Sequence, residues 1–247
     1  MRKFGLIGYP LSHSFSKKFF TQKFSAEGIE DCVYELYPIE DITLLPELIS
    51  NDPELEGLNV TIPYKLDVMP YLNEIEGAAL EIGAVNCISV NRDAGGLHLD
   101  GHNTDAYGFE TSLLPLLEPH HTKALIFGDG GAAKAVKYVL NQQRIEFLSV
   151  TRKVMPGTIT YDEVTPDILG VYTLLINTTP LGMSPDLESF PLIPYEALSE
   201  RHLAYDLVYN PEETRFLEMA RKQQAKIKNG LEMLHLQAER SWHIWNR

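Results

Sequence analysis

The sequence is poor in cysteine and has no long apolar run. Its two cysteines, Cys32 and Cys87, cannot build a disulfide framework in a chain of 247 residues, so both are expected to be buried, reduced thiols. No stretch approaches the roughly 18 apolar residues in a row that a membrane-spanning helix needs. The apolar run at the N-terminus is too short for a signal peptide. We therefore expect a cytoplasmic protein.

Basic residues are also scarce relative to acidic ones. Lys and Arg together number 21 against 34 Asp and Glu, which gives a formal net charge of −13. Because attraction to phosphates supplies most of the affinity for nucleic acids and anionic membranes, we expect no nucleic acid and no membrane as partner. With 44% hydrophobic and 22% charged residues, the composition excludes collagen-like and disordered chains. A small-molecule substrate is the expected partner, and a monomer and a homodimer are both left open.

Short apolar runs alternate with helix-like periodic segments along the whole chain. The runs that we predict as strands are 4–8, 32–37, 58–62, 84–90, 97–100, 124–127, 146–150, 173–177 and 204–207. The fourth and fifth form a hairpin, and helices are predicted after most others, including one that Pro63 opens and one after each of the last two. Such alternation is typical of an α/β fold with parallel sheets and helices on both faces. The pattern restarts near Lys123, after two prolines, which indicates a second domain.

A glycine-rich turn follows the first strand after this restart. The residues Gly128-Asp129-Gly130-Gly131 stand between the strand 124–127 and the helix predicted over 132–140. Small residues there let the backbone approach a pyrophosphate, and free N–H groups at the start of the helix attract the anion. This context favours nucleotide binding over a purely structural turn. Asp129 is expected either to point to solvent or to cap the helix.

The end of the next strand indicates which dinucleotide is bound. NAD-binding sites usually carry an acidic residue about 20 positions after the first glycine, on the ribose 2′-hydroxyl. Here the strand 146–150 ends in Thr151-Arg152-Lys153, and no acidic residue stands at its tip. Two cations and a hydroxyl suit a 2′-phosphate, so the sequence favours NADP over NAD.

Three segments of the first half carry polar groups suited to a small substrate. Ser12–Lys17 offers hydroxyls at the start of a helix, and Asn59–Lys65 places a lysine just past the end of a strand. Asn103–Gly108 places an acidic residue at a helix start. Ligands bind at the carboxyl ends of strands in open α/β sheets, so these segments are candidates for a binding site.

Together with Asn177–Met183, Asp206–Pro211 and Gly230–Gln237, these segments resemble the shikimate dehydrogenase family over nearly the whole chain. The resemblance implies a reversible, NADP-dependent reduction of 3-dehydroshikimate to shikimate, in the pathway to chorismate and aromatic amino acids. It also implies two α/β domains flanking a cleft. Residues 1–103 plus 231–247 would form the substrate-binding domain, and residues 104–230 a Rossmann-like NADP-binding domain.

The resemblance also implies roles for individual residues. The catalytic acid/base pair would be Lys65 and Asp105, because an ammonium group can supply a proton to a developing alkoxide while a carboxylate orients it. The implied substrate-binding residues are Ser14 and Ser16 for the carboxylate, with Tyr209 assisting, and Thr61, Asn86 and Gln237 for the ring hydroxyls. The cofactor-binding residues would be Gly128, Gly130, Gly131, Ala132, Thr151, Arg152, Lys153, Leu207 and Gly230. The histidines form no metal-ligand pattern, so no metal is expected.

Two alternative functions are left open, and one segment departs from the family pattern. A quinate/shikimate dehydrogenase with a broader substrate range or NAD use is the first alternative, although the serine pair favours shikimate. A non-catalytic dinucleotide-binding sensor is the second, although it would have no reason to keep Lys65 and Asp105 together. The departure is the segment 154–160, whose Pro, Gly and β-branched residues predict a loop or short strand where the family usually has a helix.

Overall fold

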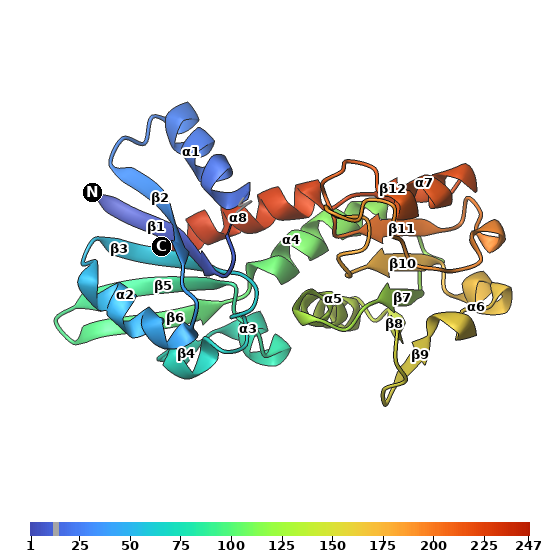
Figure 1. The fold of residues 1–247 in the computed structure, drawn as a ribbon, viewed down its shortest axis with the longest axis horizontal. Coiled ribbons are helices and arrows are strands. Elements are labelled where there is room, and N and C mark those ends of the chain that lie inside the picture. Colours follow the sequence, from blue (N-terminus) through green and yellow to red (C-terminus); the bar gives the residue numbers. More distant parts are fainter. Residues whose placement is uncertain (12–14) are drawn as a thin grey trace. The chain divides into compact units, whose positions relative to one another are not determined.

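The structure, a computed structural model, describes residues 1–11 and 15–247 (Figure 1). The chain forms two compact units, Met1–Tyr107 with Gln237–Arg247, and Gly108–Leu236. The chain passes from one unit to the other within the helices α4 (Thr104–Leu113) and α8 (Leu231–Trp245). Each unit contains one six-stranded sheet, which confirms the predicted two-domain α/β fold class.

The first sheet has the strand order β2-β1-β3-β5-β6-β4 and mixed strand directions. Its strands are β1 (Arg2–Gly8), β2 (Cys32–Pro38), β3 (Leu55–Val60), β4 (Glu74–Ile75), β5 (Cys87–Asp93) and β6 (Gly96–His102). β1 is parallel to β2 and β3, whereas β5 is antiparallel to β3 and β6. The prediction of parallel sheets is therefore wrong for this half. The predicted hairpin explains why, because a turn as tight as Asp93–Gly96 can join only antiparallel strands.

Helix α8 completes the core of the first unit. Trp245 stacks on Phe4 with 4.9 Å between ring centroids, and its Nε1 donates a hydrogen bond to the Ile88 carbonyl at 2.9 Å. A Cβ atom at Gly57 would lie 2.3 Å from Trp245 Nε1, so the strand β3 must carry glycine there for the indole to fit. The other helices of this unit are α1 (Phe15–Glu27), α2 (Leu45–Asn51), α3 (Gly77–Ile82), and the short 3-10 helices η1 (Ile42–Leu44) and η2 (Met69–Tyr71).

The helix predicted to open at Pro63 does not form. Residues 61–68 are a series of turns, followed by η2. Pro70 lies only seven positions after Pro63, and a proline inside a helix lacks the N–H that would bond the carbonyl four residues back, so a helix begun at Pro63 would be broken there. The turn is held instead by Tyr64, whose hydroxyl donates to the Ile39 carbonyl at 2.7 Å.

The second sheet is entirely parallel, with the order β12-β11-β10-β7-β8-β9. Its strands are β7 (Lys123–Phe127), β8 (Glu146–Thr151), β9 (Thr158–Thr160), β10 (Leu174–Asn177), β11 (Leu203–Asp206) and β12 (Lys226–Lys228). Counted from β7, this is the doubly wound Rossmann order, in which ligands bind beyond the carboxyl ends of the strands where the order reverses. That point lies between β7 and β10.

The connections in this unit agree with the sequence predictions in part. Its helices are α5 (Gly131–Gln142), α6 (Pro166–Val171), α7 (Arg215–Lys222) and the 3-10 helices η3 (Leu114–Leu116), η4 (Tyr161–Glu163) and η5 (Tyr195–Ala197). The short strand β9 confirms the prediction for the segment after Arg152. The helix predicted after the strand at 173–177 is wrong, because prolines at 180, 185, 191 and 194 interrupt that connection, and only η5 forms.

The two cysteines are free thiols and both are buried, as predicted. Burial raises the pKa of the Cys87 thiol to about 12, so this side chain is protonated and inert at neutral pH. Across residues 1–11 and 15–247, no helix has the length and apolar character that crossing a membrane requires.

Candidate functional site

Lys65 and Asp105 form a close ion pair in the first unit. Lys65 Nζ donates to Asp105 Oδ2 at 2.6 Å, and the two side chains are 21% and 13% exposed. Lys65 lies on the turn after β3, where its carbonyl accepts from the Val85 N–H at 2.8 Å. Asp105 lies in the first turn of α4. A short, mostly buried contact between opposite charges holds the ammonium group in one position.

Thr104, next to Asp105, joins the predicted residues Asn86 and Gln237. The Thr104 N–H donates to Asn86 Oδ1 at 2.6 Å, and Asn86 Nδ2 donates to Thr104 Oγ1 at 3.0 Å. The Thr104 hydroxyl donates in turn to Gln237 Oε1 at 3.3 Å. The two amides therefore lie on either side of one fully buried threonine, immediately beside the ion pair.

The other residues predicted to bind substrate are Ser14, Ser16, Thr61 and Tyr209. Ser14 lies outside the described residues. Ser16 is half-buried in the first turn of α1 and hydrogen-bonds the Tyr34 side chain. Thr61 is half-buried directly after β3, and its N–H donates to the Ile7 carbonyl at 3.0 Å. Tyr209 belongs to the second unit, and partial burial raises the pKa of its hydroxyl.

Three buried polar residues of the first unit were not predicted. Tyr34 on β2 donates to Asn59 Oδ1 at 2.8 Å, and Asn59 Nδ2 donates to Ser241 Oγ on α8 at 2.8 Å. Ser241 stands four positions after Gln237, which is one helical turn. That spacing was the only sequence signal for its position, and nothing in the sequence connected it with Asn59.

The glycine turn in the second unit leaves room for an anion. Gly128 has φ +100°, and a Cβ atom there would lie 2.8 Å from Thr178 Oγ1, so both its conformation and its neighbours require glycine. Gly130 is the N-cap of α5 and provides no side-chain hydrogen bond. A Cβ atom on Gly130 or Gly131 would meet nothing within 4 Å. The first N–H groups of α5 therefore face open space, which fits a pyrophosphate.

Asp129 and the end of β8 complete this part of the unit. The Asp129 carboxylate forms an ion pair with Lys137 on α5, so it does not cap the helix and its charge beside the turn is offset. At the end of β8, Thr151 is buried, and its hydroxyl bonds the Lys153 carbonyl at 2.8 Å. Arg152 and Lys153 are exposed. The threonine thus shapes the turn, while the two cations are accessible to a phosphate.

Asp206 at the end of β11 connects two of the segments that resemble the family, Asn177–Met183 and Asp206–Pro211, with Thr214. Its Oδ1 accepts from Asn177 Nδ2 at 2.9 Å and from the Val208 N–H at 3.0 Å, and its Oδ2 accepts from Thr214 Oγ1 at 2.5 Å. Burial raises the pKa of Asp206 to about 6 despite these three donors. Asp206 belongs to one of the motifs in the sequence, but its role as an acceptor of three hydrogen bonds was not predicted.

Leu207 and Gly230, both predicted near the nicotinamide, pack directly on each other. A Cβ atom at Gly230 would lie 2.1 Å from the Leu207 carbonyl oxygen, so only glycine fits. The Gly230 N–H also donates to the Val208 carbonyl at 3.1 Å. The backbone after β11 and the start of α8 are therefore held together.

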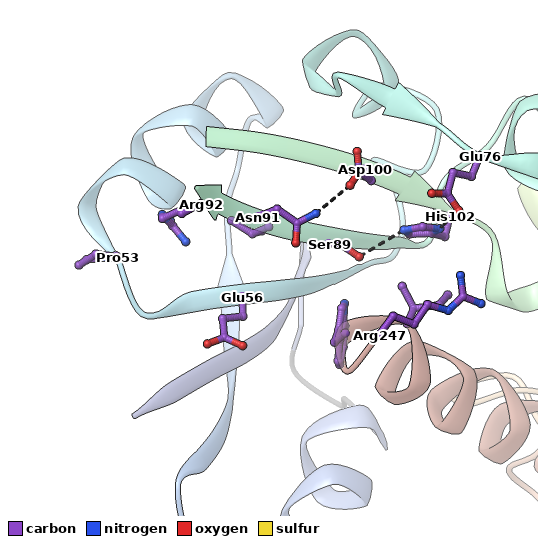
Figure 2. Close-up of a pocket in the computed structure, with 12 residues that line it drawn as sticks. Pro53, Glu56, Glu76, Ser89, Asn91, Arg92, Asp100, His102 and Arg247 are labelled. Carbon is purple, nitrogen blue, oxygen red and sulfur yellow. Dashed lines mark hydrogen bonds and ion pairs between the residues drawn. The ribbon is translucent and has the colours of Figure 1, made fainter. Parts of the chain in front are cut away.

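Figure 2 shows a pocket elsewhere in the first unit, on the polar face of β5 and β6 near the end of α8. In it, Ser89 Oγ lies 3.2 Å from His102 Nε2, and Asn91 Nδ2 donates to Asp100 Oδ2 at 2.8 Å. None of the predicted site residues lines this pocket. The pocket is therefore distinct from the predicted substrate site.

Near this pocket, Glu74, His98 and Asp100 place possible metal-ligating atoms within 4.8 Å of one another. Glu74 and His98 are exposed, and exposed acidic groups commonly gather in this way without an ion. The group shares no residue with the predicted site.

A doubly wound parallel sheet, an uncapped helix start behind a glycine turn and a separate unit with a lysine–carboxylate pair define a two-domain, dinucleotide-binding enzyme. Residues 6–88 match the family model described as the shikimate dehydrogenase substrate binding domain. The chain is 38% identical to a shikimate dehydrogenase (NADP(+)) of Clostridium beijerinckii, over 99% of this chain and 92% of that protein. It is 36% identical to one of Staphylococcus aureus, over 98% and 92%. The chain belongs to the shikimate dehydrogenase family.

Solved structures agree with this assignment. The shikimate dehydrogenase of Thermus thermophilus, in complex with NADP(H) and shikimate, aligns with a TM-score of 0.84 and 29% identity over 99% of this chain and 93% of its own. That of Listeria monocytogenes, in complex with shikimate and NAD, aligns with a TM-score of 0.86 and 26% identity over 100% and 92%.

Proposed function

We propose that this protein catalyses the reversible, NADP-dependent reduction of 3-dehydroshikimate to shikimate. The observation that carries the proposal is the 2.6 Å contact between Lys65 and Asp105, adjacent to the amides of Asn86 and Gln237. Family membership supports it, since relatives carry the name shikimate dehydrogenase (NADP(+)) and the Thermus thermophilus relative binds both NADP(H) and shikimate.

In the proposed reaction, a ketone, NADPH and a proton give an alcohol and NADP+. The cofactor supplies the hydride, and the protein manages the charge that develops on the ketone oxygen. Lys65 donates a proton from Nζ to this oxygen as the new C–H bond forms, and it regains a proton from water. Asp105 orients the ammonium group through the 2.6 Å hydrogen bond. In the oxidation of shikimate, neutral Lys65 accepts the hydroxyl proton.

In this proposal, all of the substrate-binding residues except Tyr209 belong to the first unit. Ser14 and Ser16 would bind the carboxylate of the substrate with help from Tyr209, and Thr61, Asn86 and Gln237 would bind the ring hydroxyls. These groups are neutral and can donate hydrogen bonds, which suits a substrate that carries a carboxylate and ring hydroxyls. The substrate-binding domain would consist of residues 1–103 and 231–247.

The cofactor is held by residues 104–230 in this proposal. Gly128, Gly130, Gly131 and Ala132 bring the backbone and the N-terminus of α5 to the pyrophosphate. Arg152 and Lys153 bind the 2′-phosphate at the end of β8, beside Thr151. Leu207 and Gly230 line the nicotinamide. A cytoplasmic location and a monomeric or homodimeric state stay predictions from the sequence.

Substrate and cofactor preference are tested together in one set of assays. Shikimate and quinate are each combined with NADP+ and NAD+, and the absorbance of the reduced nicotinamide is followed. Shikimate with NADP+ is expected to give the highest kcat/KM. Comparable rates with NAD+ or quinate would favour the broader dehydrogenase, a candidate that the NAD-bound Listeria monocytogenes relative supports. If no combination produces reduced cofactor, the proposed function is wrong.

A further inference from the structure

A buried path of polar side chains joins three elements around the proposed substrate residues. It comprises Asn59 on β3, Thr104 at the start of α4 and Ser241 on α8, which are 5%, 0% and 0% exposed. Asn59 Nδ2 donates to Ser241 Oγ at 2.8 Å, and Ser241 Oγ donates to the Gln237 carbonyl at 3.0 Å. Thr104 Oγ1 lies 3.4 Å from Ser241 Oγ and 3.3 Å from Gln237 Oε1.

A serine at this place is not what packing alone favours. Its half of α8 otherwise presents Ala238, Ile244 and Trp245 to an apolar cluster. A hydroxyl costs free energy to bury unless it is hydrogen-bonded, and a serine that bonds its own helix four residues back is neutral to unfavourable for helix stability. The Ser241 hydroxyl is therefore explained by its partners. Asn59, Thr104 and Gln237 touch or belong to the proposed substrate site, and the Cys87 thiol on β5 is a further partner.

The donors and acceptors fix the direction of the hydrogen bond between Asn59 and Ser241. Asn59 Nδ2 also lies 3.3 Å from the backbone carbonyl oxygen of Asn86, which can only accept. The side-chain amide of Asn59 must therefore point its nitrogen, and not its oxygen, toward this carbonyl. Ser241 Oγ then accepts from Asn59 and gives its single proton to the Gln237 carbonyl.

Thr104 Oγ1 accepts from Asn86 Nδ2 and has one proton. Two acceptors lie 3.3 Å from this hydroxyl, Gln237 Oε1 and Asn86 Oδ1. Gln237 is thus contacted at two points, at its backbone carbonyl by Ser241 and at its amide oxygen by Thr104.

We propose that Ser241 is a positioning residue for Gln237. Ser241 bonds Asn59 on the sheet and the Gln237 carbonyl one turn back on α8. These two hydrogen bonds fix the rotation of the helix about its axis, so that the Gln237 side chain faces the substrate. This inference rests on the proposed function, in which Gln237 binds a ring hydroxyl of the substrate. Ser241 itself does not contact the substrate.

The test measures the dissociation constant of shikimate by calorimetry. We expect S241A to weaken shikimate binding about tenfold, the effect of losing one well-placed hydrogen bond, and to leave NADP+ binding unchanged. In a Q237A background, S241A is expected to have no further effect, because the residue it positions is absent. Ser112, a buried serine on α4 that bonds Gly108 O at 2.7 Å and the Tyr205 hydroxyl, provides the matched control. S112A should leave shikimate affinity unchanged.

Two results would overturn the proposal. One is unchanged shikimate affinity in S241A, and the other is an equal loss in the wild-type and Q237A backgrounds, which would show a general structural effect. If S241A does not fold, S241C preserves the volume with a weaker hydrogen bond and is judged by the same two criteria. Wild-type protein that binds shikimate without turnover would refute the proposed function alone, because the binding comparison would still decide the role of Ser241.

Discussion

Asp206 gives the second unit a pH dependence that can be worked out from its surroundings. Burial raises the pKa of this carboxyl from its ordinary 3.8 to about 6. The difference corresponds to roughly 3 kcal/mol, since one pKa unit is equivalent to about 1.4 kcal/mol. The substitution Asp206→Asn removes the ionisation while keeping the shape. The asparagine oxygen can still accept from Asn177 and Val208, and its NH2 group can donate to Thr214.

The sign follows from proton binding in the folded and unfolded states. Below pH 3.8 the carboxyl is protonated in both states and its ionisation has no effect. As the pH rises from 3.8 to about 6, the unfolded chain loses this proton first, so the free energy of unfolding falls. Above about pH 6 the full penalty is present. The stability of Asp206→Asn relative to wild type should therefore rise by up to roughly 3 kcal/mol between pH 4 and pH 7.

Hydrogen exchange of the β10 and β11 amides, corrected for intrinsic rates, measures this difference in the second unit itself. The exposed Asp186 provides the control, because Asp186→Asn should leave the pH dependence as in wild type. The reasoning is refuted if Asp206→Asn and wild type show the same dependence on pH, or if the Asp206 carboxyl titrates near its ordinary value by carbon NMR.

Four further substitutions have distinct expected outcomes. Gly128→Ala should lower the melting temperature, because it removes about 1–3 kcal/mol of unfolding free energy. Gly130→Ala, whose added methyl group would face open space, should fold normally and weaken NADP+ binding. Equal melting temperatures for the two variants would contradict this. Arg152→Ala should raise the KM for NADP+ about tenfold and leave the KM for NAD+ unchanged, so a parallel change in both would exclude a 2′-phosphate contact. Trp245→Ala should cost about 3–5 kcal/mol of unfolding free energy, and an undiminished stability in denaturant titration would show that α8 does not complete the first core.

Local sequence signals predicted much of the fold. Apolar runs located nine of the twelve strands in the described residues, and the glycine turn marked the start of α5, because strand burial and tight turns depend on neighbouring residues. The runs missed the short edge strands β4 and β12, which have few residues to form a pattern. The helix at Pro63 was predicted wrongly, since a favourable start was considered without Pro70 seven positions later. The mixed directions of the first sheet depend on pairing between distant strands, which no local pattern states.

The candidate site residues could be predicted only through the family resemblance. The buried residues that hold them in place could not be predicted from the sequence. Lys65 and Asp105 stand 40 positions apart, and the sequence alone gives no reason for them to meet at 2.6 Å. Asn59 and Ser241 stand 182 positions apart and touch because α8 returns to the first unit. Contacts of this kind depend on how helices pack on a sheet, so they become visible only in three dimensions.

The turnover of Lys65→Ala in shikimate oxidation with NADP+ tests the central claim most directly. Proton transfer by a positioned group is worth about 10²–10⁴ in rate, or roughly 3–5 kcal/mol of barrier. The account predicts that kcat falls by this factor, while the dissociation constant of shikimate changes much less. A Lys65→Ala variant that keeps near-normal kcat would contradict the assignment of Lys65 and Asp105 as the acid/base pair.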